Sequence, residues 1–188
     1  IVDGNSSDGT LAIVKQYQLN HPNVVFKIVS EPDKGIYDAL NKGIQLATGD
    51  VIGFVHSDDM LASETIISKI VAAFSNSNVN GVYGDLEYVD KENSNNVIRH
   101  WKSKNFHPKL LKQGWMPAHP TLFLKRDVYK KHEDFNLSYN IAADYDFMLR
   151  VLKDKSLKFD YLPKVITKMR VGGASNRSLK NIIQNKKR

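Results

Sequence analysis

The sequence has 188 residues, which is the length of a single globular domain. Apolar residues make up 41% and charged residues 25%, close to the averages for globular domains, so collagen-like, repetitive and disordered chains are excluded. There is no cysteine, which excludes a disulfide framework and cysteine-bound metal sites and fits a reducing compartment. The apolar runs are too short to cross a bilayer.

The charge is divided unevenly along the chain. Residues 1–100 carry 7 Lys and Arg against 13 Asp and Glu, a net charge of −6, whereas residues 101–188 carry 20 against 7, a net charge of +13; together they give the +7 of the whole chain. Acidic groups could bind a cation, and basic groups could face phosphates, an anionic membrane or nucleic acid. The alternative is a solvated basic surface.

Strand-like and helix-like segments alternate three times in the first 75 residues. After a strand end at Ile1-Val2, the loop chemistry predicts a turn and a helix that Thr10 or Asp8 caps. The apolar spacing then predicts a strand over 24–29, a helix over 36–47, a strand over 51–55 and a helix that Ser63 caps and that runs through Phe74. This alternation predicts a parallel sheet with helices on its faces. Ligands bind beyond the carboxyl ends of such strands, where the acidic loops Asp3–Asp8 and Asp58-Asp59 are expected.

The second half is less regular and predicts a smaller mixed region. We expect a hairpin of strands 81–89 and 97–101, a strand over 122–124, a helix over 143–153, strands over 159–162 and 164–169, and a basic amphipathic helix over 178–188. The chain opens on a strand and on Ile1 rather than Met, so we interpret it as a fragment whose beginning is missing.

Adjacent carboxylates at Asp58 and Asp59 follow an apolar strand. Hard cations such as Mg²⁺ and Mn²⁺ prefer oxygen ligands and are usually held by few carboxylates plus substrate phosphates. The sequence therefore indicates either a metal site or a solvated acidic turn before the helix that follows.

Three further residues have both a functional and a structural interpretation. A buried Asp3 could accept hydrogen bonds from a nucleobase or ribose, or belong to a turn. Asp144 could be a general base, or complement a helix N-terminus. His119, held between two prolines, could contact substrate or be structural.

Four segments occur together in an order typical of a known family. They are IVDGNSSDGT at 1–10, SEPDKGIYDALNKG at 30–43, SDD at 57–59, and ADYD at 143–146 followed by Arg150. Over essentially the whole chain the sequence resembles family 2 glycosyltransferases of the GT-A fold, of the kind that builds bacterial polysaccharides. The family's first strand is absent, Ala143 replaces a common Glu, and His56 stands where Asn or Asp is usual.

The resemblance implies an α/β, Rossmann-like, mostly parallel sheet with helices on both faces, plus a smaller mixed acceptor-side region. Residues 1–100 would be the nucleotide-sugar-binding half, and residues 101–188 the acceptor-binding half of the same domain. The implied site residues are the catalytic base Asp144, the donor-binding Asp3, Lys34 and Asp58, the metal ligand Asp59, and His119 and Arg170 on the acceptor side.

The implied reaction moves a hexosyl or N-acetylhexosaminyl group, with inversion, from a nucleoside-diphosphate sugar to a hydroxyl group. A UDP-sugar donor, Mn²⁺ or Mg²⁺, and a glycan or polyprenyl-diphosphate-linked acceptor of cell-surface polysaccharide synthesis are expected. The protein would be cytoplasmic, with possible peripheral contact with anionic lipid at the inner face of the membrane, and no nucleic-acid partner is expected.

Two alternatives remain. A non-catalytic relative that binds sugar nucleotides or glycans is favoured by Ala143 and by the absent first strand. A basic module for a membrane surface or nucleic acid is favoured by the basic second half, although no nucleic-acid motif is recognised.

Overall fold

The computed structural model describes residues 1–24 and 26–172, which belong to two compact units. The first unit contains Ile1–Ile52 and Arg126–Val151, and the second contains Gly53–Lys125 and the chain from Leu152 onward. The expected helix over 178–188 lies outside the described residues. In the part of the chain that is described, no helix is both long and apolar enough to cross a membrane.

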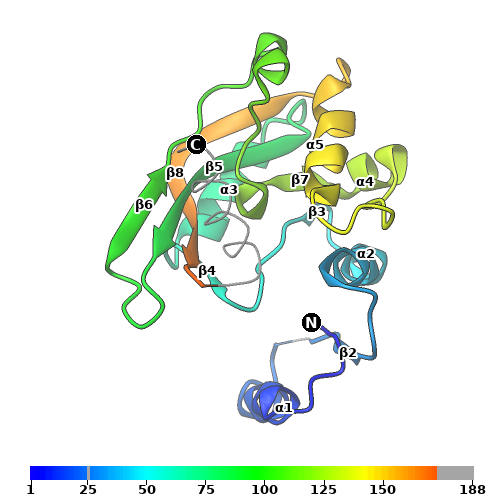
Figure 1. Cartoon of the computed structure of the whole chain (residues 1–188), viewed down its shortest axis with the longest axis vertical. Helices are drawn as coiled ribbons and strands as arrows, with labels where there is room; N and C mark the ends of the chain where they lie inside the picture. Colours follow the sequence, from blue (N-terminus) through cyan, green and yellow to red (C-terminus); the bar gives the residue numbers. More distant parts are fainter. Residues whose placement is uncertain (25, 173–188) are drawn as a thin grey trace, which may run out of the picture. The chain divides into compact units, whose positions relative to one another are not determined.

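The first unit begins with a β–α–β arrangement, as the sequence predicts. Its elements are β1 (Val2–Asp3), α1 (Thr10–Asn20), β2 (Val29–Ser30), α2 (Ile36–Leu46), β3 (Val51–Ile52), α4 (Arg126–His132) and most of α5 (Ala143–Lys153). Strands β1 and β2 are parallel, and α1 connects them and lies beside them (Figure 1). The prediction of a strand over 24–29 was wrong in extent, because β1 offers only two residues for pairing.

Helix α2 forms where its apolar spacing predicts it. Leu40 and Ile44, four residues apart, are the buried residues of the helix. Gly35 precedes the helix at φ 111°, a backbone angle that a residue with a Cβ rarely adopts. In contrast, α1 has no buried residue, and its Tyr17 is 53% exposed.

The second unit is built on a mixed sheet. Its strands are β4 (Asp59–Leu61), β5 (Gly81–Val89), β6 (Val97–Trp101), β7 (Phe123–Lys125) and β8 (Phe159–Arg170), accompanied by α3 (Ile66–Phe74) and the 3₁₀ turns η1 (Pro108–Gln113) and η2 (His119–Thr121). Strand β5 pairs parallel with β8 and antiparallel with β6 and β7, and β8 pairs antiparallel with β4. The β5–β6 hairpin is as predicted.

The core of this unit lies between α3 and the central strands. Ile66 and Ile70 of α3 are almost fully buried, and α3 lies against β5 and β8 (Figure 1). Val82 of β5 and Ile166 of β8 have no exposed surface. Burying each such aliphatic side chain stabilises the fold by roughly 1.5–3 kcal/mol.

Two predicted strands, over 159–162 and 164–169, form the single strand β8. Between the pairs Tyr83–Tyr161 and Asp85–Val165, β8 contains two more residues than β5. The proline at 163 lies in this irregular stretch, where a missing N–H is tolerated. A Cβ at Gly84 would lie 2.6 Å from the carbonyl oxygen of Lys164, so the close approach of the strands requires glycine.

The region around the two adjacent carboxylates differs from the prediction. The expected strand over 51–55 is shortened to β3, and Asp59 begins the additional strand β4. Helix α3 begins at Ile66 with Thr65 as its N-cap residue, so the prediction that Ser63 caps it was wrong. The carbonyl oxygen of Ser63 instead accepts a hydrogen bond from the N–H of Ile66.

Candidate functional site

Asp3 lies buried at the end of β1 and is held by its own loop. Its carboxylate accepts hydrogen bonds from the Ser6 N–H (3.0 Å), the Ser6 hydroxyl (2.5 Å) and the Ser30 hydroxyl of β2 (2.7 Å). The bonds from Ser6 and Ser30 hold the pKa of Asp3 below its usual value. An ionised Asp3 therefore fixes the loop that follows β1.

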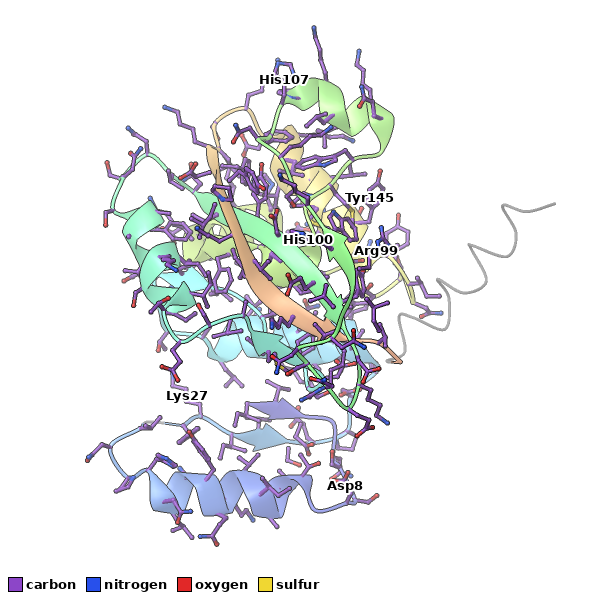
Figure 2. All side chains as sticks on the ribbon, turned by 90° about the vertical axis from the view of Figure 1, so that its left-hand side faces the viewer. Asp8, Lys27, Arg99, His100, His107 and Tyr145 are labelled. Atoms are coloured by element: carbon purple, nitrogen blue, oxygen red, sulfur yellow. The ribbon has the colours of Figure 1, made fainter. Side chains whose placement is uncertain are left out.

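The same loop continues to Asp8, which forms the predicted turn before α1. The Asp8 carboxylate accepts a hydrogen bond from the Thr10 N–H at 2.9 Å, and Figure 2 shows Asp8 at the start of α1. The hydrogen bonds to Thr10 lower the pKa of Asp8. This contact confirms the turn. The predicted cap was wrong, because Gly9 is the N-cap residue of α1 and no side chain caps it.

The turn before α2 is held by side-chain-to-backbone hydrogen bonds. Asp33 accepts from the Gly35 N–H at 2.9 Å, and Asp38 accepts from the Lys34 N–H at 3.0 Å. A Cβ at Gly4 would lie 2.5 Å from a carboxylate oxygen of Asp33, so the Asp3 loop and this turn touch. The Lys34 side chain is exposed, which leaves it accessible to a ligand.

Asp144, the predicted base, lies at the beginning of α5 and is half-buried. The Tyr37 hydroxyl donates to its carboxylate at 3.0 Å and accepts a hydrogen bond from the Ala142 N–H at 3.1 Å. Burial and the Asp144 charge raise the pKa of Tyr37, so the tyrosine remains a donor. Tyr37 therefore holds Asp144 beside the N-terminal turn of α2.

Neighbouring residues explain two features of this helix start. Asp146 pairs with Arg150 at 3.0 Å, the ion pair that the spacing predicts. Ala143 is fully buried, so a glutamate there would have to bury its carboxylate. The first acid of the Glu-Asp pair that the resemblance implies is thus absent, and a buried alanine packs in its place.

Asp59 is the most unusual carboxylate of the second unit. It is 9% exposed, and neither of its carboxylate oxygens has a hydrogen-bond partner. Burial, reinforced by the charge of Asp58, raises the pKa of Asp59 to about 7. Buried carboxylates are normally hydrogen-bonded, so both oxygens remain available to a ligand.

These properties of Asp59 fit a divalent cation, which binds carboxylate oxygens and neutralises their charge. Half-buried Asp58 directly precedes it in a turn, and the carbonyl oxygen of His56 accepts the Asp59 N–H at 3.0 Å. Within residues 1–24 and 26–172, no group of three or more His, Asp or Glu is arranged to hold a metal ion. A cation at Asp59 would therefore take further ligands from substrate or water.

His119 and Arg170 also belong to the second unit. His119 is 8% exposed, and its ring centroid lies 5.8 Å from that of Phe54 and 6.2 Å from that of His56. Arg170 ends β8 directly after Met169, the register partner of Asp59. Strand pairing thus places the expected acceptor-side arginine next to the Asp59 strand.

The predicted residues fall into two groups. The first unit contains Asp3, Lys34 and Asp144, and the second contains Asp58, Asp59, His119 and Arg170. The functions of these seven residues, and the division at residue 100 into donor and acceptor halves, stay predictions. Tyr37 was missed as a site residue, although it lies within the segment 30–43 that carries the resemblance.

Solved structures share this architecture. A TarS fragment from Staphylococcus aureus, in complex with UDP-GlcNAc, matches with a TM-score of 0.72 at 17% identity, over 94% of this chain and 50% of that chain. The mannosyltransferase PcManGT from Pyrobaculum calidifontis, in complex with GDP-Man and Mn²⁺, matches with a TM-score of 0.66 at 17% identity, over 95% and 49%. The fold is that of the GT-A glycosyltransferases, which confirms the expected fold class. The sheet of the second unit is mixed, however, and not mostly parallel as expected.

Sequence comparison identifies the family. Residues 1–132 match Glycosyl transferase family 2, and the chain belongs to this family. It is 28% identical over 179 residues to a PGL/p-HBAD biosynthesis glycosyltransferase of Mycobacterium bovis, covering 94% of this chain and 66% of that protein. The chain thus spans just under two thirds of the length of this relative and about half of the matched structures.

Proposed function

We propose that the chain transfers a sugar from a nucleoside-diphosphate sugar to a hydroxyl group of a glycan acceptor, with a divalent cation bound at Asp59. The observation that carries this proposal is Asp59 itself, a buried carboxylate whose two oxygens have no hydrogen-bond partner. A buried carboxylate without hydrogen bonds destabilises a fold. A bound cation that contacts both oxygens would remove this cost and would explain why the residue is there.

The cation would be Mn²⁺ or Mg²⁺, held by Asp59 and by oxygens of the donor. When bound, it would neutralise the negative charge that develops on the leaving nucleoside diphosphate. Asp58, which is half-buried and adjacent, would lie toward the ribose or diphosphate. Asp3 would contact the base and Lys34 would approach the donor.

Asp144 is proposed as the general base that removes the proton from the acceptor hydroxyl. Its carboxylate is half-buried and is oriented by Tyr37. Because the base is already held in position, it loses little conformational entropy when it aligns with the acceptor hydroxyl. The acceptor oxygen then attacks the anomeric carbon. Attack from the face opposite the leaving group would invert the anomeric configuration.

UDP is proposed as the donor nucleotide, with GDP and dTDP as alternatives. The TarS structure contains UDP-GlcNAc and the PcManGT structure contains GDP-Man with Mn²⁺, which supports a nucleotide-sugar donor and a cation. His119 and Arg170 would lie on the side of a glycan or polyprenyl-diphosphate-linked acceptor. Assembly of a cell-surface polysaccharide at the cytoplasmic face of a membrane would fit such an acceptor.

Retained donor binding without transfer is the second candidate function. Fully buried Ala143 favours it, because the site has one acid fewer than is common in the family. Transfer and binding therefore have to be measured separately.

The test is calorimetric titration of UDP, GDP and dTDP into the 188-residue chain, with Mn²⁺ and again with EDTA. We expect one nucleotide to bind only with Mn²⁺, and Asp59→Asn to remove that binding. The exposed carboxylate of Glu64 provides a matched control, since Glu64→Gln should bind as the wild type does. Equal binding with and without EDTA, or unchanged binding by Asp59→Asn, would contradict the metal assignment.

A further inference from the structure

Arg99 of the edge strand β6 lies over two aromatic rings. Its guanidinium carbon is 5.5 Å from the ring centroid of Tyr88 and 5.7 Å from that of Trp101. Tyr88 is buried, Trp101 is half-buried and Arg99 is exposed, as Figure 2 shows for the labelled arginine on β6. Both distances are within the range of cation–π attraction.

The stacking leaves the hydrogen-bonding edge of the guanidinium available. A guanidinium has five N–H donors in its plane, and ring contacts engage its face rather than these donors. In the described part of the chain no carboxylate pairs with Arg99. The arginine is therefore fixed in orientation while its donors are free for the two oxygens of an anionic group.

Arg99 shares a face of the sheet with Asp59. Arg99 pairs with Tyr88, Tyr88 pairs with Met169, and Met169 pairs with Asp59, so the four side chains form one row across β6, β5, β8 and β4. With strands about 4.8 Å apart, the backbones of Arg99 and Asp59 are about 14 Å apart. Arg99 thus lies on the same face of the sheet as the proposed metal ligand.

The segment that contains Arg99 carries charge of one sign only. Within the second unit, residues 97–125 contain 6 Lys and Arg and no Asp or Glu. Basic charge concentrated in this way raises the local concentration of anions. The charge of this segment therefore favours an acidic partner over a neutral one.

We propose that Arg99, stacked on Tyr88 and Trp101, binds a carboxylate or phosphate of an acidic glycan acceptor. The exposed part of the Trp101 ring would pack against the neighbouring sugar. This assignment rests on the proposed glycosyltransferase function and names the class of its acceptor. It makes Arg99 a specificity-determining residue.

Tryptophan fluorescence can report on this position alone. The chain has 2 tryptophans, and Trp115 stacks on Phe106 at 6.2 Å, so Trp115→Phe retains an aromatic ring there and leaves Trp101 as the only tryptophan. This variant is titrated, with UDP and Mn²⁺ present, with three probes. They are a chondroitin tetrasaccharide, N-acetylglucosamine linked to farnesyl diphosphate, and neutral chitotetraose.

We expect at least one acidic probe to change the Trp101 emission and to bind at least about tenfold more tightly than chitotetraose, as a charge-assisted contact implies. The chondroitin probe tests carboxylate as the source of the anion, and the diphosphate probe tests phosphate. Arg99→Ala should abolish the preference and Arg99→Lys, which keeps the charge without the planar stack, should weaken it. The exposed Lys69 of α3 gives the charge-matched control Lys69→Ala, which should leave it unchanged.

Equal affinity for acidic and neutral probes, no binding of either acidic probe, or a preference that survives Arg99→Ala would overturn the assignment. Calorimetry with UDP and Mn²⁺ on the same variants separates the two proposals. If UDP binds while the acidic preference is absent, only the acceptor assignment fails. If none of UDP, GDP and dTDP binds, the glycosyltransferase proposal fails as well.

Discussion

Asp59→Asn should make the metal-free chain more stable at pH 8, even though it removes the proposed metal ligand. Burial first, and the Asp58 charge second, raise the pKa of Asp59 from 3.8 to about 7 in the folded chain. The folded state therefore binds this proton more tightly than the unfolded state does. Stability from this group is present below pH 3.8 and is lost as the pH rises toward 7.

The magnitude follows from the two pKa values. The difference between 3.8 and about 7 corresponds to at most about 4 kcal/mol. Partial access of solvent to the carboxylate reduces the expected effect to about 2 kcal/mol. Asparagine has nearly the same shape and no charge, so the variant should gain about this amount at pH 8 and almost nothing at pH 4.

Urea unfolding in EDTA at pH 4 and pH 8 measures this difference. Glu64→Gln is the control, and its exposed side chain should change the unfolding free energy by less than about 0.5 kcal/mol. With Mn²⁺ and UDP present, the wild type should become more stable than Asp59→Asn. Ligand at 100 times Kd stabilises the wild type by about 2.7 kcal/mol and leaves the variant, which does not bind it, unaffected. An Asp59→Asn variant less stable than the wild type at pH 8 without metal would show that a charged, buried Asp59 does not destabilise the fold.

Three further substitutions test the first unit. Asp144→Asn should lower the transfer rate by about 10²–10⁴-fold and leave the affinity for UDP unchanged. The control Asp127→Asn, which changes an exposed side chain of α4, should leave the transfer rate unchanged in the same assay. Tyr37→Phe removes the hydrogen bonds that join Tyr37 to Asp144 and Ala142, so it should lower the unfolding free energy by about 1 kcal/mol and reduce kcat. An unchanged kcat would exclude a positioning role for Tyr37. Gly35→Ala forces a Cβ onto φ 111° and should lower thermal stability by about 1–3 kcal/mol, and no change in Tm would contradict that strain.

The long periodic elements could be predicted from the sequence because local patterns determine them. Strand β5 and helix α5 have the predicted bounds, and α2 differs by one residue. Strand β6 also has the predicted bounds, and β7 differs by one residue. Strand β4 could not be predicted, since it exists through its pairing with β8, more than 100 residues later. The proline at 163 indicated a break that the bulge in β8 accommodates.

In the candidate site, too, local interactions could be predicted from the sequence and long-range ones could not. The loop interactions of Asp3 and Asp8 follow from turn chemistry within a few residues. The contact between Tyr37 and Asp144 joins residues that are 107 positions apart in the sequence, so no local periodicity predicts it. The burial of Asp59 depends likewise on the strand beside it, so the sequence indicated an acidic pair without its raised pKa.

Binding of Mn²⁺ shows whether Asp59 is a metal ligand. The paramagnetic resonance signal of free Mn²⁺ is followed as the chain is added, with and without UDP, for the wild type, Asp59→Asn and Glu64→Gln. We expect the wild type and Glu64→Gln to remove Mn²⁺ from solution when UDP is present, and Asp59→Asn to leave it free. Equal loss of the signal with all three proteins would contradict the assignment of the metal to Asp59.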